Sequence, residues 1–172
     1  ARSDLQVESL TIFDPGADYY RQHVPTCAYG EAGRLRRYAS DGGGYFDFPV
    51  KVMSYQGEQL EGQVFDTVVS INVIEHVENA FEFLNRLHAA LRPGGLLIFH
   101  DRYFEDSFDA AWQLGYTVML HPIRVRRAVL DWLLADMDVI FNNCDADADG
   151  RDREQSYYVI ARKRAEGEGD TA

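Results

Sequence analysis

Cysteine is scarce in this chain and long apolar runs are missing, and the two shortages exclude several classes of protein. Cys27 and Cys144 are its only cysteines, too few for a disulfide framework and without the spacing of a metal-ligand pair. No apolar run approaches the roughly 18 residues that a membrane-spanning helix needs, and no secretion leader opens the sequence. We therefore expect a soluble protein of the cytoplasm with no membrane partner.

Positive charge is the second shortage. The chain has 17 Lys and Arg residues against 28 Asp and Glu residues, which gives a net charge of −11. Such a chain repels nucleic acid phosphates unless its basic residues cluster. The sequence therefore predicts no nucleic acid partner, and it leaves the oligomeric state open.

Apolar and aromatic residues, by contrast, are plentiful, at 46% and 13% of the chain. This composition suits a folded domain rather than a disordered chain. Because 172 residues leave little room for a second domain, we expect residues 1–163 to form a single domain. A tail rich in Glu and Gly, over residues 164–172, is predicted to be disordered.

Two periodicities alternate along the chain and predict an α/β fold. Apolar runs predict strands over residues 9–13, 50–55, 65–71, 96–99, 139–141 and 157–161, and helices are predicted over residues 17–38, 78–91 and 129–137. Since residues 65–71 are almost continuously apolar, we expect them to form a central strand. Residues 65–99 have the proportions of a parallel crossover unit, and the last two strands are predicted to form an antiparallel edge hairpin.

One segment carries a family resemblance. Phe65-Asp-Thr-Val-Val-Ser-Ile-Asn-Val-Ile-Glu-His-Val77 resembles the FDxVxxxxVxEH pattern of the Rossmann-like (class I) S-adenosylmethionine-dependent methyltransferases. Leu91-Arg-Pro-Gly-Gly95 resembles the "LxPGG" turn before that family's fifth strand, and His121-Pro-Ile-Arg124 resembles a later segment. The resemblance covers about residues 9–163.

The resemblance implies a fold, a cofactor and a reaction. The implied fold is a three-layer Rossmann-like methyltransferase sheet, mainly parallel, with an antiparallel C-terminal hairpin. The implied cofactor is S-adenosylmethionine, and the implied reaction is methyl transfer to a small-molecule acceptor.

The sequence departs from the family at its start. The family opens with a strand and a GxGxG turn that lets the backbone approach the cofactor, whereas only Ala1–Glu8 precede the first predicted strand here, without a glycine. The Gly42–Gly44 run lies too late to replace that turn. We interpret the chain as N-terminally incomplete, with a degenerate relative as the alternative. On either interpretation we expect the chain to bind the cofactor weakly or not at all, which leaves its activity open, and a non-catalytic interaction domain is the alternative function.

Cofactor-binding residues follow from the resemblance at three places. Asp14, after the first strand, is expected to accept hydrogen bonds from the ribose hydroxyls; the alternative is an ordinary Asp-Pro-Gly turn. Gln56 and Glu58 stand where the family contacts adenine, and a solvated loop is the alternative.

The third place is the end of the strand at residues 65–71. Asn72, Glu75 and His76 are expected to line the cofactor pocket, because parallel sheets bind ligands beyond the carboxyl ends of their strands. A structural histidine at a helix start is the alternative for His76.

Acceptor-side residues are predicted after the next strand. His100 and Asp101 are the catalytic candidates, with His100 receiving a proton from the acceptor and Asp101 orienting its ring or meeting a cationic acceptor. The alternative is a polar strand end that faces water. His121 and Arg124 are weaker candidates for the same pocket mouth, with Arg124 as a clamp for an acceptor anion.

A calcium-like pattern, Asp145-Ala-Asp-Ala-Asp-Gly150, has alternating carboxylates and a turn glycine. Position twelve of such a loop is Ser156 instead of Glu, and the flanks read as strands. We therefore interpret it as a solvated hairpin turn and predict no metal site.

Overall fold

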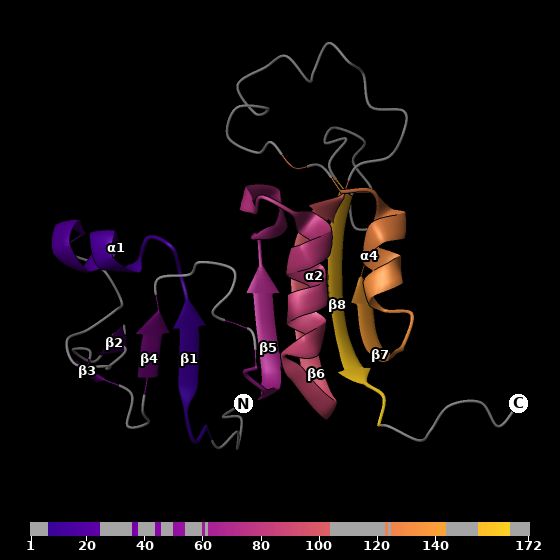
Figure 1. Cartoon of the computed structure of the whole chain (residues 1–172), viewed down its shortest axis with the longest axis horizontal. Helices are drawn as coiled ribbons and strands as arrows, with labels where there is room; N and C mark the ends of the chain where they lie inside the picture. Colours follow the sequence, from indigo (N-terminus) through magenta and orange to yellow (C-terminus); the bar gives the residue numbers. More distant parts are fainter. Residues whose placement is uncertain are drawn as a thin grey trace, which may run out of the picture. The chain divides into compact units, whose positions relative to one another are not determined.

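The computed structural model describes residues 7–24, 36–37, 44–45, 50–53, 60, 62–103, 123, 125–143 and 155–165. The chain divides into two compact units, residues 1–59 and residues 60–172, which are described separately below (Figure 1). The assignment of residues 1–163 to one domain stays a prediction, and residues 166–172 of the tail lie outside the described part.

The first unit contains a parallel strand pair. β1 (Leu10–Phe13) pairs with β4 (Val50–Met53), with Leu10 opposite Val50, and both strands were predicted. α1 (Ala17–His23) follows β1, and the short strands β2 (Arg36–Arg37) and β3 (Gly44–Tyr45) pair antiparallel.

The helix predicted over residues 17–38 is much shorter in the structure. α1 ends at His23, and Val24 has an extended backbone with φ −111° and ψ 100°. The next residue is Pro25, and the ring of a proline disfavours the helical conformation of the residue before it. The Val-Pro pair therefore explains the early helix end.

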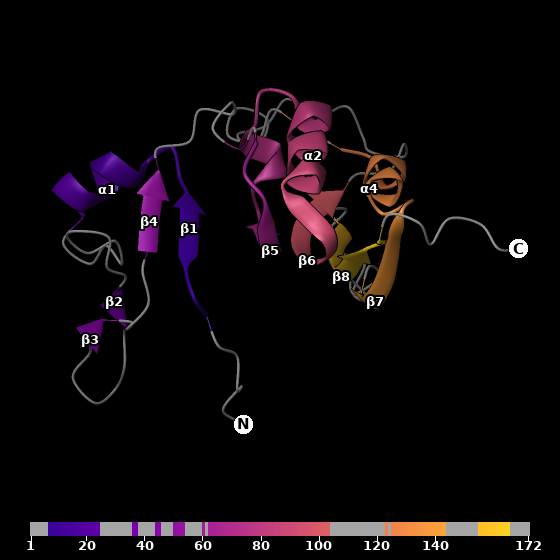
Figure 2. The same ribbon diagram turned by 60° about the horizontal axis from the view of Figure 1, so that its bottom comes forward.

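The second unit is a four-stranded sheet covered on one face by helices (Figure 2). Its elements are β5 (Phe65–Ile71), the 3₁₀ turn η3 (Ile74–His76), α2 (Ala80–Ala89), β6 (Leu91–Tyr103), α4 (Arg127–Leu133), β7 (Met137–Asn143) and β8 (Gln155–Lys163). The strand order is β5-β6-β8-β7. β5 and β6 are parallel, and Thr67 lies opposite Leu96, so the predicted crossover over residues 65–99 is confirmed.

The predicted C-terminal hairpin is also confirmed. β8 is antiparallel to both β6 and β7, and β7 lies at the sheet edge. Because β8 inserts between two strands that run the same way, this sheet has more antiparallel contacts than parallel ones, whereas a mainly parallel sheet was expected. The parallel pairs in the described part are β1–β4 and β5–β6.

The expectation of a central strand at residues 65–71 is wrong for this sheet. β5 is an edge strand of the four, and Val69 and Ile71 are 59% and 53% exposed. The prediction took the continuous apolar run as a sign that both faces of the strand are buried. In the structure only one face of β5, which carries Val68 and the buried Ser70, packs against the core.

α2 begins at a side-chain N-cap and buries one face. The Asn79 side chain accepts a hydrogen bond from the Glu82 backbone N–H at 3.1 Å, which is the usual N-cap arrangement. Phe83, Leu84 and Leu87 are buried. Phe81 lies outside this buried face: it is 55% exposed and contacts the Trp132 ring edge-on.

Glycine is required in the turn that follows α2. Gly94 has φ +75°, and a Cβ on Gly95 would lie 2.9 Å from the Arg92 carbonyl oxygen and 3.1 Å from that of Asp66. No other residue fits such a close backbone approach. The predicted Pro-Gly-Gly turn thus brings the start of β6 directly against β5.

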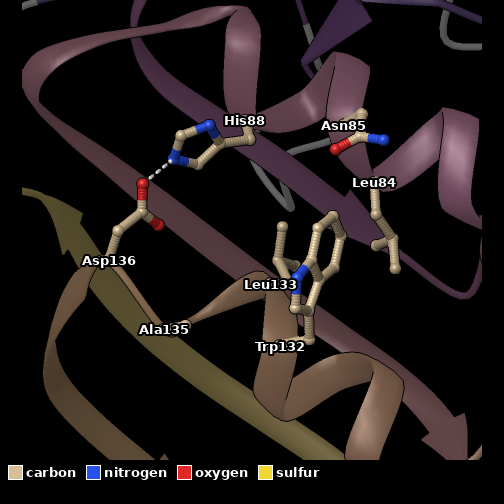
Figure 3. Close-up of a pocket in the computed structure, with 7 residues that line it drawn as sticks. All are labelled: Leu84, Asn85, His88, Trp132, Leu133, Ala135 and Asp136. Carbon is tan, nitrogen blue, oxygen red and sulfur yellow. Dashed lines mark ion pairs between the residues drawn. The ribbon is translucent and has the colours of Figure 1, made fainter.

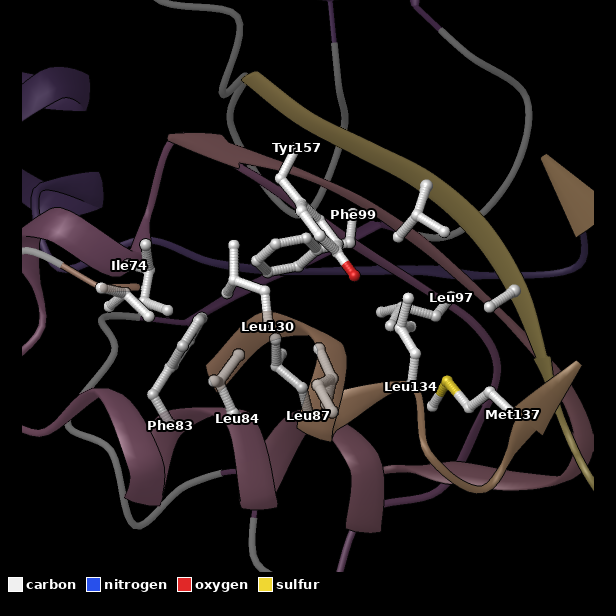
Figure 4. Packing of buried hydrophobic residues seen from close by; sticks show 14 of the residues in the cluster. Ile74, Phe83, Leu84, Leu87, Leu97, Phe99, Leu130, Leu134, Met137 and Tyr157 are labelled. Atoms are coloured by element: carbon white, nitrogen blue, oxygen red, sulfur yellow. The ribbon is translucent and has the colours of Figure 1, made fainter. Parts of the chain in front are cut away.

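The core of this unit lies between the sheet and its two helices (Figure 4). Leu84 and Leu87 of α2 and Leu130 of α4 pack against Leu97 and Phe99 of β6. Met137 belongs to this core from β7 and not from a helix, because α4 ends at Leu133. No helix in the described part of the chain is long and apolar enough to cross a membrane.

Candidate active site

The residues predicted to line the cofactor pocket follow β5 in a tight turn. Asn72 has a positive φ of 53°, a conformation that asparagine tolerates better than most residues. Its backbone N–H donates to the His100 carbonyl at 2.9 Å. Asn72 and His76 are exposed, whereas Glu75 is only 5% exposed.

The turn after β5 meets β6 beside His100 and Asp101. Ile71, the last residue of β5, lies opposite His100, and the turn over residues 72–76 follows it. β6 continues to Tyr103, so the expectation that His100 and Asp101 follow the end of their strand is wrong. The carboxyl end of β5 is the edge at which parallel sheets bind ligands. The structure shows where these residues lie, and their roles in cofactor binding and catalysis stay predictions.

Asp101 has contacts that favour a structural role. Its side chain is fully buried, and its Oδ2 atom accepts hydrogen bonds from the backbone N–H groups of Val73 and Ile74 at 2.9 and 2.8 Å. Its Oδ1 atom accepts from the Arg102 backbone N–H at 3.0 Å. A carboxylate held in this way is not presented to an acceptor arriving from solvent.

His100 lies on the opposite face of β6, because successive residues of a strand alternate. Its Nε2 atom is 2.8 Å from Ser156 Oγ, and its ring contacts the Tyr158 ring edge-on, with centroids 5.9 Å apart. The expectation that Asp101 orients the His100 ring is therefore wrong. Ser156 and Tyr158 hold that ring instead, and sequence reasoning missed both because the β6–β8 register cannot be read from the chain.

Asp14, in the first unit, forms the turn that was its alternative interpretation. Its Oδ1 atom accepts a hydrogen bond from the Gly16 backbone N–H at 2.8 Å, and its own N–H donates to the Met53 carbonyl at 3.0 Å. The carboxylate thus stands at the end of β1, between β4 and the start of α1. Ribose binding by Asp14 stays a prediction.

Several candidates lie outside the described residues: Gln56, Glu58, His121, Arg124, Cys27, Cys144 and the acidic segment at residues 145–150. Within the part of the chain that the structure covers, no three His, Cys, Asp or Glu side chains form a metal-binding group.

A pocket of about 280 Å³ lies between α2 and α4, on the helical layer (Figure 3). His88 Nε2 and Asp136 Oδ2 form an ion pair of 2.9 Å at one side of it, and Trp132 and Leu84 stand at the other. None of the sequence-predicted site residues lines this pocket, so it is separate from the strand-end site.

The chain is similar to known methyltransferases in sequence over part of its length and in structure. Residues 31–97 match the family model of a methyltransferase domain. A SAM-dependent methyltransferase from Methanosarcina mazei superposes with a TM-score of 0.57 at 13% identity, covering 92% of this chain and 83% of the other. The N-methyltransferase NodS from Bradyrhizobium japonicum, in complex with S-adenosyl-L-homocysteine, superposes with a TM-score of 0.51 at 14% identity, covering 94% and 80%.

Other similar structures are considerably longer than this chain. It covers 42% of TehB from Haemophilus influenzae and 37% of an O-methyltransferase family protein from Burkholderia thailandensis. No curated protein matches the sequence. At these identities the structural likeness establishes the fold, and the Rossmann-like methyltransferase fold predicted from residues 65–99 is confirmed.

Proposed function

We propose that the chain is a class I S-adenosylmethionine-dependent methyltransferase, which transfers a methyl group from S-adenosylmethionine to a small-molecule acceptor in the cytoplasm. The match of residues 31–97 to a methyltransferase domain and the shared fold support this proposal. The observation that supports this most is that the turn at residues 72–76, at the carboxyl end of β5, lies beside His100 of the parallel strand β6. Ligands of open parallel sheets bind at such an edge.

The residues present fit S-adenosylmethionine in part. Asn72 and His76 are exposed after β5, where they can contact the cofactor, while Glu75 is buried. For Asp14, in the first unit, and for Gln56 and Glu58, outside the described residues, our proposal keeps the ribose and adenine contacts that were predicted from the sequence. When bound, the cofactor supplies a sulfonium methyl group that is ready to transfer.

This chain's own contribution to the chemistry is positioning and, for an acceptor that must lose a proton, a base. His100 is that base in our proposal. With its Nε2–H donated to Ser156 Oγ, across the 2.8 Å contact, its Nδ1 atom accepts the proton. Tyr158 holds the ring plane through its edge-on contact.

The test is a titration of the ¹⁵N-labelled chain with S-adenosylhomocysteine, the product form of the cofactor, followed by NMR. We expect the amide signals of Asn72 and His76 to shift, together with that of Asp14. Signals from Trp132 and His88, in the pocket on the helical layer, should stay in place. Methyl transfer is then measured with a panel of small hydroxyl, amine and carbon acids.

A non-catalytic interaction domain is the second candidate. The edge position of β5 in its four-stranded sheet and the exposed side chains of Val69 and Ile71 favour it, because exposed apolar residues on an edge strand are typical of binding surfaces. Millimolar S-adenosylhomocysteine that moves none of the three amide signals, even in a chain that also carries a strand and a GxGxG turn ahead of Ala1, would decide for this candidate and against methyl transfer.

A further inference from the structure

The buried carboxylate of Asp101 links β6 to the turn that follows β5. Asp101 has no exposed surface, and a buried charge is costly unless hydrogen bonds compensate it. Here three backbone N–H groups do so, and two of them, from Val73 and Ile74, lie 28 and 27 residues earlier in the chain.

The two distant donors start the η3 turn. The first N–H groups of any helical turn lack partners within the turn, and no side chain of the turn itself caps it at Val73. The carboxylate of Asp101, on the neighbouring strand β6, caps the turn instead. It does so directly after Asn72, whose φ of 53° turns the chain away from β5.

We infer that Asp101 is a positioning residue, which fixes the backbone of the turn at residues 72–76 and so places Asn72 and His76 toward the cofactor. This inference rests on the proposed function and replaces the catalytic role expected for Asp101. Asp101 acts through the turn and contacts neither cofactor nor acceptor.

The arrangement requires a carboxylate instead of an amide. Oδ2 faces two N–H donors and Oδ1 faces a third. In Asp101→Asn, which preserves the shape of the side chain, an NH₂ group must face the Arg102 N–H or the N–H groups of Val73 and Ile74. Two donors then oppose each other at a buried position.

The experiment compares the full chain with Asp101→Asn and with Asp66→Asn as the matched control. Asp66 is an exposed carboxylate that pairs with Arg92, so the control removes the same charge without touching the turn. In Asp101→Asn we expect amide exchange at Val73 and Ile74 to accelerate at least about tenfold, with Phe99 and Val159 still protected. The control should exchange like the parent chain.

The second readout is affinity for S-adenosylhomocysteine, measured by NMR titration. We expect the dissociation constant to rise about tenfold in Asp101→Asn, as when a supporting partner of a binding group is lost, and to be unchanged in Asp66→Asn. Faster exchange with unchanged affinity would make Asp101 a structural residue only and overturn the inference. If the parent chain does not bind S-adenosylhomocysteine, even with a strand and a GxGxG turn ahead of Ala1, the proposed function is refuted. The amide exchange rates of Val73 and Ile74 still test whether Asp101 fixes the turn.

If Asp101→Asn does not fold, the parent chain provides the test. Scalar couplings across the hydrogen bonds, from the amide nitrogens of Val73 and Ile74 to the Asp101 carboxylate carbon, should be observed. Their absence, in spectra that show such couplings within the β6–β8 pairs, would contradict the inference.

Discussion

At the scale of single residues, the alternation of side chains along β6 separates two neighbours. His100 and Asp101 are adjacent, yet one contacts Ser156 across the sheet and the other binds the turn after β5. Both residues could be picked from the sequence as polar groups at a strand end. Their partners could not, because these depend on the register between strands that are far apart in the chain.

In a chain that also carries a strand and a GxGxG turn ahead of Ala1, and is active, we expect His100→Ala to lower the turnover rate by roughly 10²-fold at saturating cofactor if the acceptor must lose a proton. Affinity for the cofactor should stay nearly unchanged. Ser156→Ala, which keeps the base and removes its hydrogen-bond partner, should cost less, roughly tenfold. Rates are measured at millimolar S-adenosylmethionine across the neutral pH range. Full turnover of His100→Ala throughout that range would exclude His100 as the base.

Asp14→Ala should affect binding instead of turnover. A carboxylate that accepts hydrogen bonds from ribose contributes roughly 10- to 100-fold in affinity, so the dissociation constant for S-adenosylhomocysteine should rise by that factor. Asp18→Ala is the matched control, because Asp18 is an exposed carboxylate in the first turn of α1, close to Asp14 in the chain, and pairs with Arg21. If Asp14→Ala lowers stability but leaves affinity intact, Asp14 only forms the turn with Gly16.

At the scale of elements, the structure agrees best with the sequence where several local signals coincide. Residues 65–71 form β5 with the predicted bounds, and α2 lies within the predicted 78–91 because Asn79 caps it and the Pro-Gly-Gly turn follows it. Predictions from one signal were weaker. The polar segment at residues 17–38 gave a helix of seven residues, and the apolar run of β5 did not make it a central strand.

Lys163, at the end of β8, contacts both α2 and β6, and neither contact could be predicted from the sequence. Its Nζ donates to the His88 carbonyl of α2 at 2.9 Å and to the Leu91 carbonyl of β6 at 3.0 Å. A charged donor near the C-terminus of a helix is favourable. We expect Lys163→Met to lower the free energy of unfolding by about 1–2 kcal/mol in urea titrations.

Arg162→Met is the control for this change. Arg162 is an exposed neighbour on the same strand, and surface substitutions of this kind usually stay within about 0.5 kcal/mol. Equal losses in the two variants would mean that a general loss of positive charge, and not the contact with the end of α2, is responsible.

β5 should show an alternating pattern of amide exchange. Because the Asn72 N–H points to β6, the N–H groups of Val68 and Ser70 point the same way, and those of Val69 and Ile71 point to the open edge. We expect slow exchange at the first pair and fast exchange at the second. Protection of Val69 and Ile71 in the isolated chain would reveal a strand partner on that edge.

At the scale of the whole molecule, the family's cofactor contacts are only partly present in these 172 residues. The turn after β5, Asp14 and His100 are the predicted contacts, but no strand followed by a GxGxG turn occurs in the sequence. Such a turn supplies backbone donors and close approach to the cofactor. Its contribution cannot come from side chains, because only a glycine backbone allows that approach.

We therefore expect the chain to bind S-adenosylmethionine and S-adenosylhomocysteine with dissociation constants of roughly 10⁻⁴ M or weaker, since each charged or buried hydrogen bond that is missing costs about 1.5–3 kcal/mol. Calorimetry and NMR titration of the 172-residue chain measure this directly. A chain that also carries a strand and a GxGxG turn ahead of Ala1 should bind more tightly, with the same dependence on Asp14. Low-micromolar affinity of the chain as given would mean that other donors hold the methionine part of the cofactor, and the residues at 72–76 would be the first to examine.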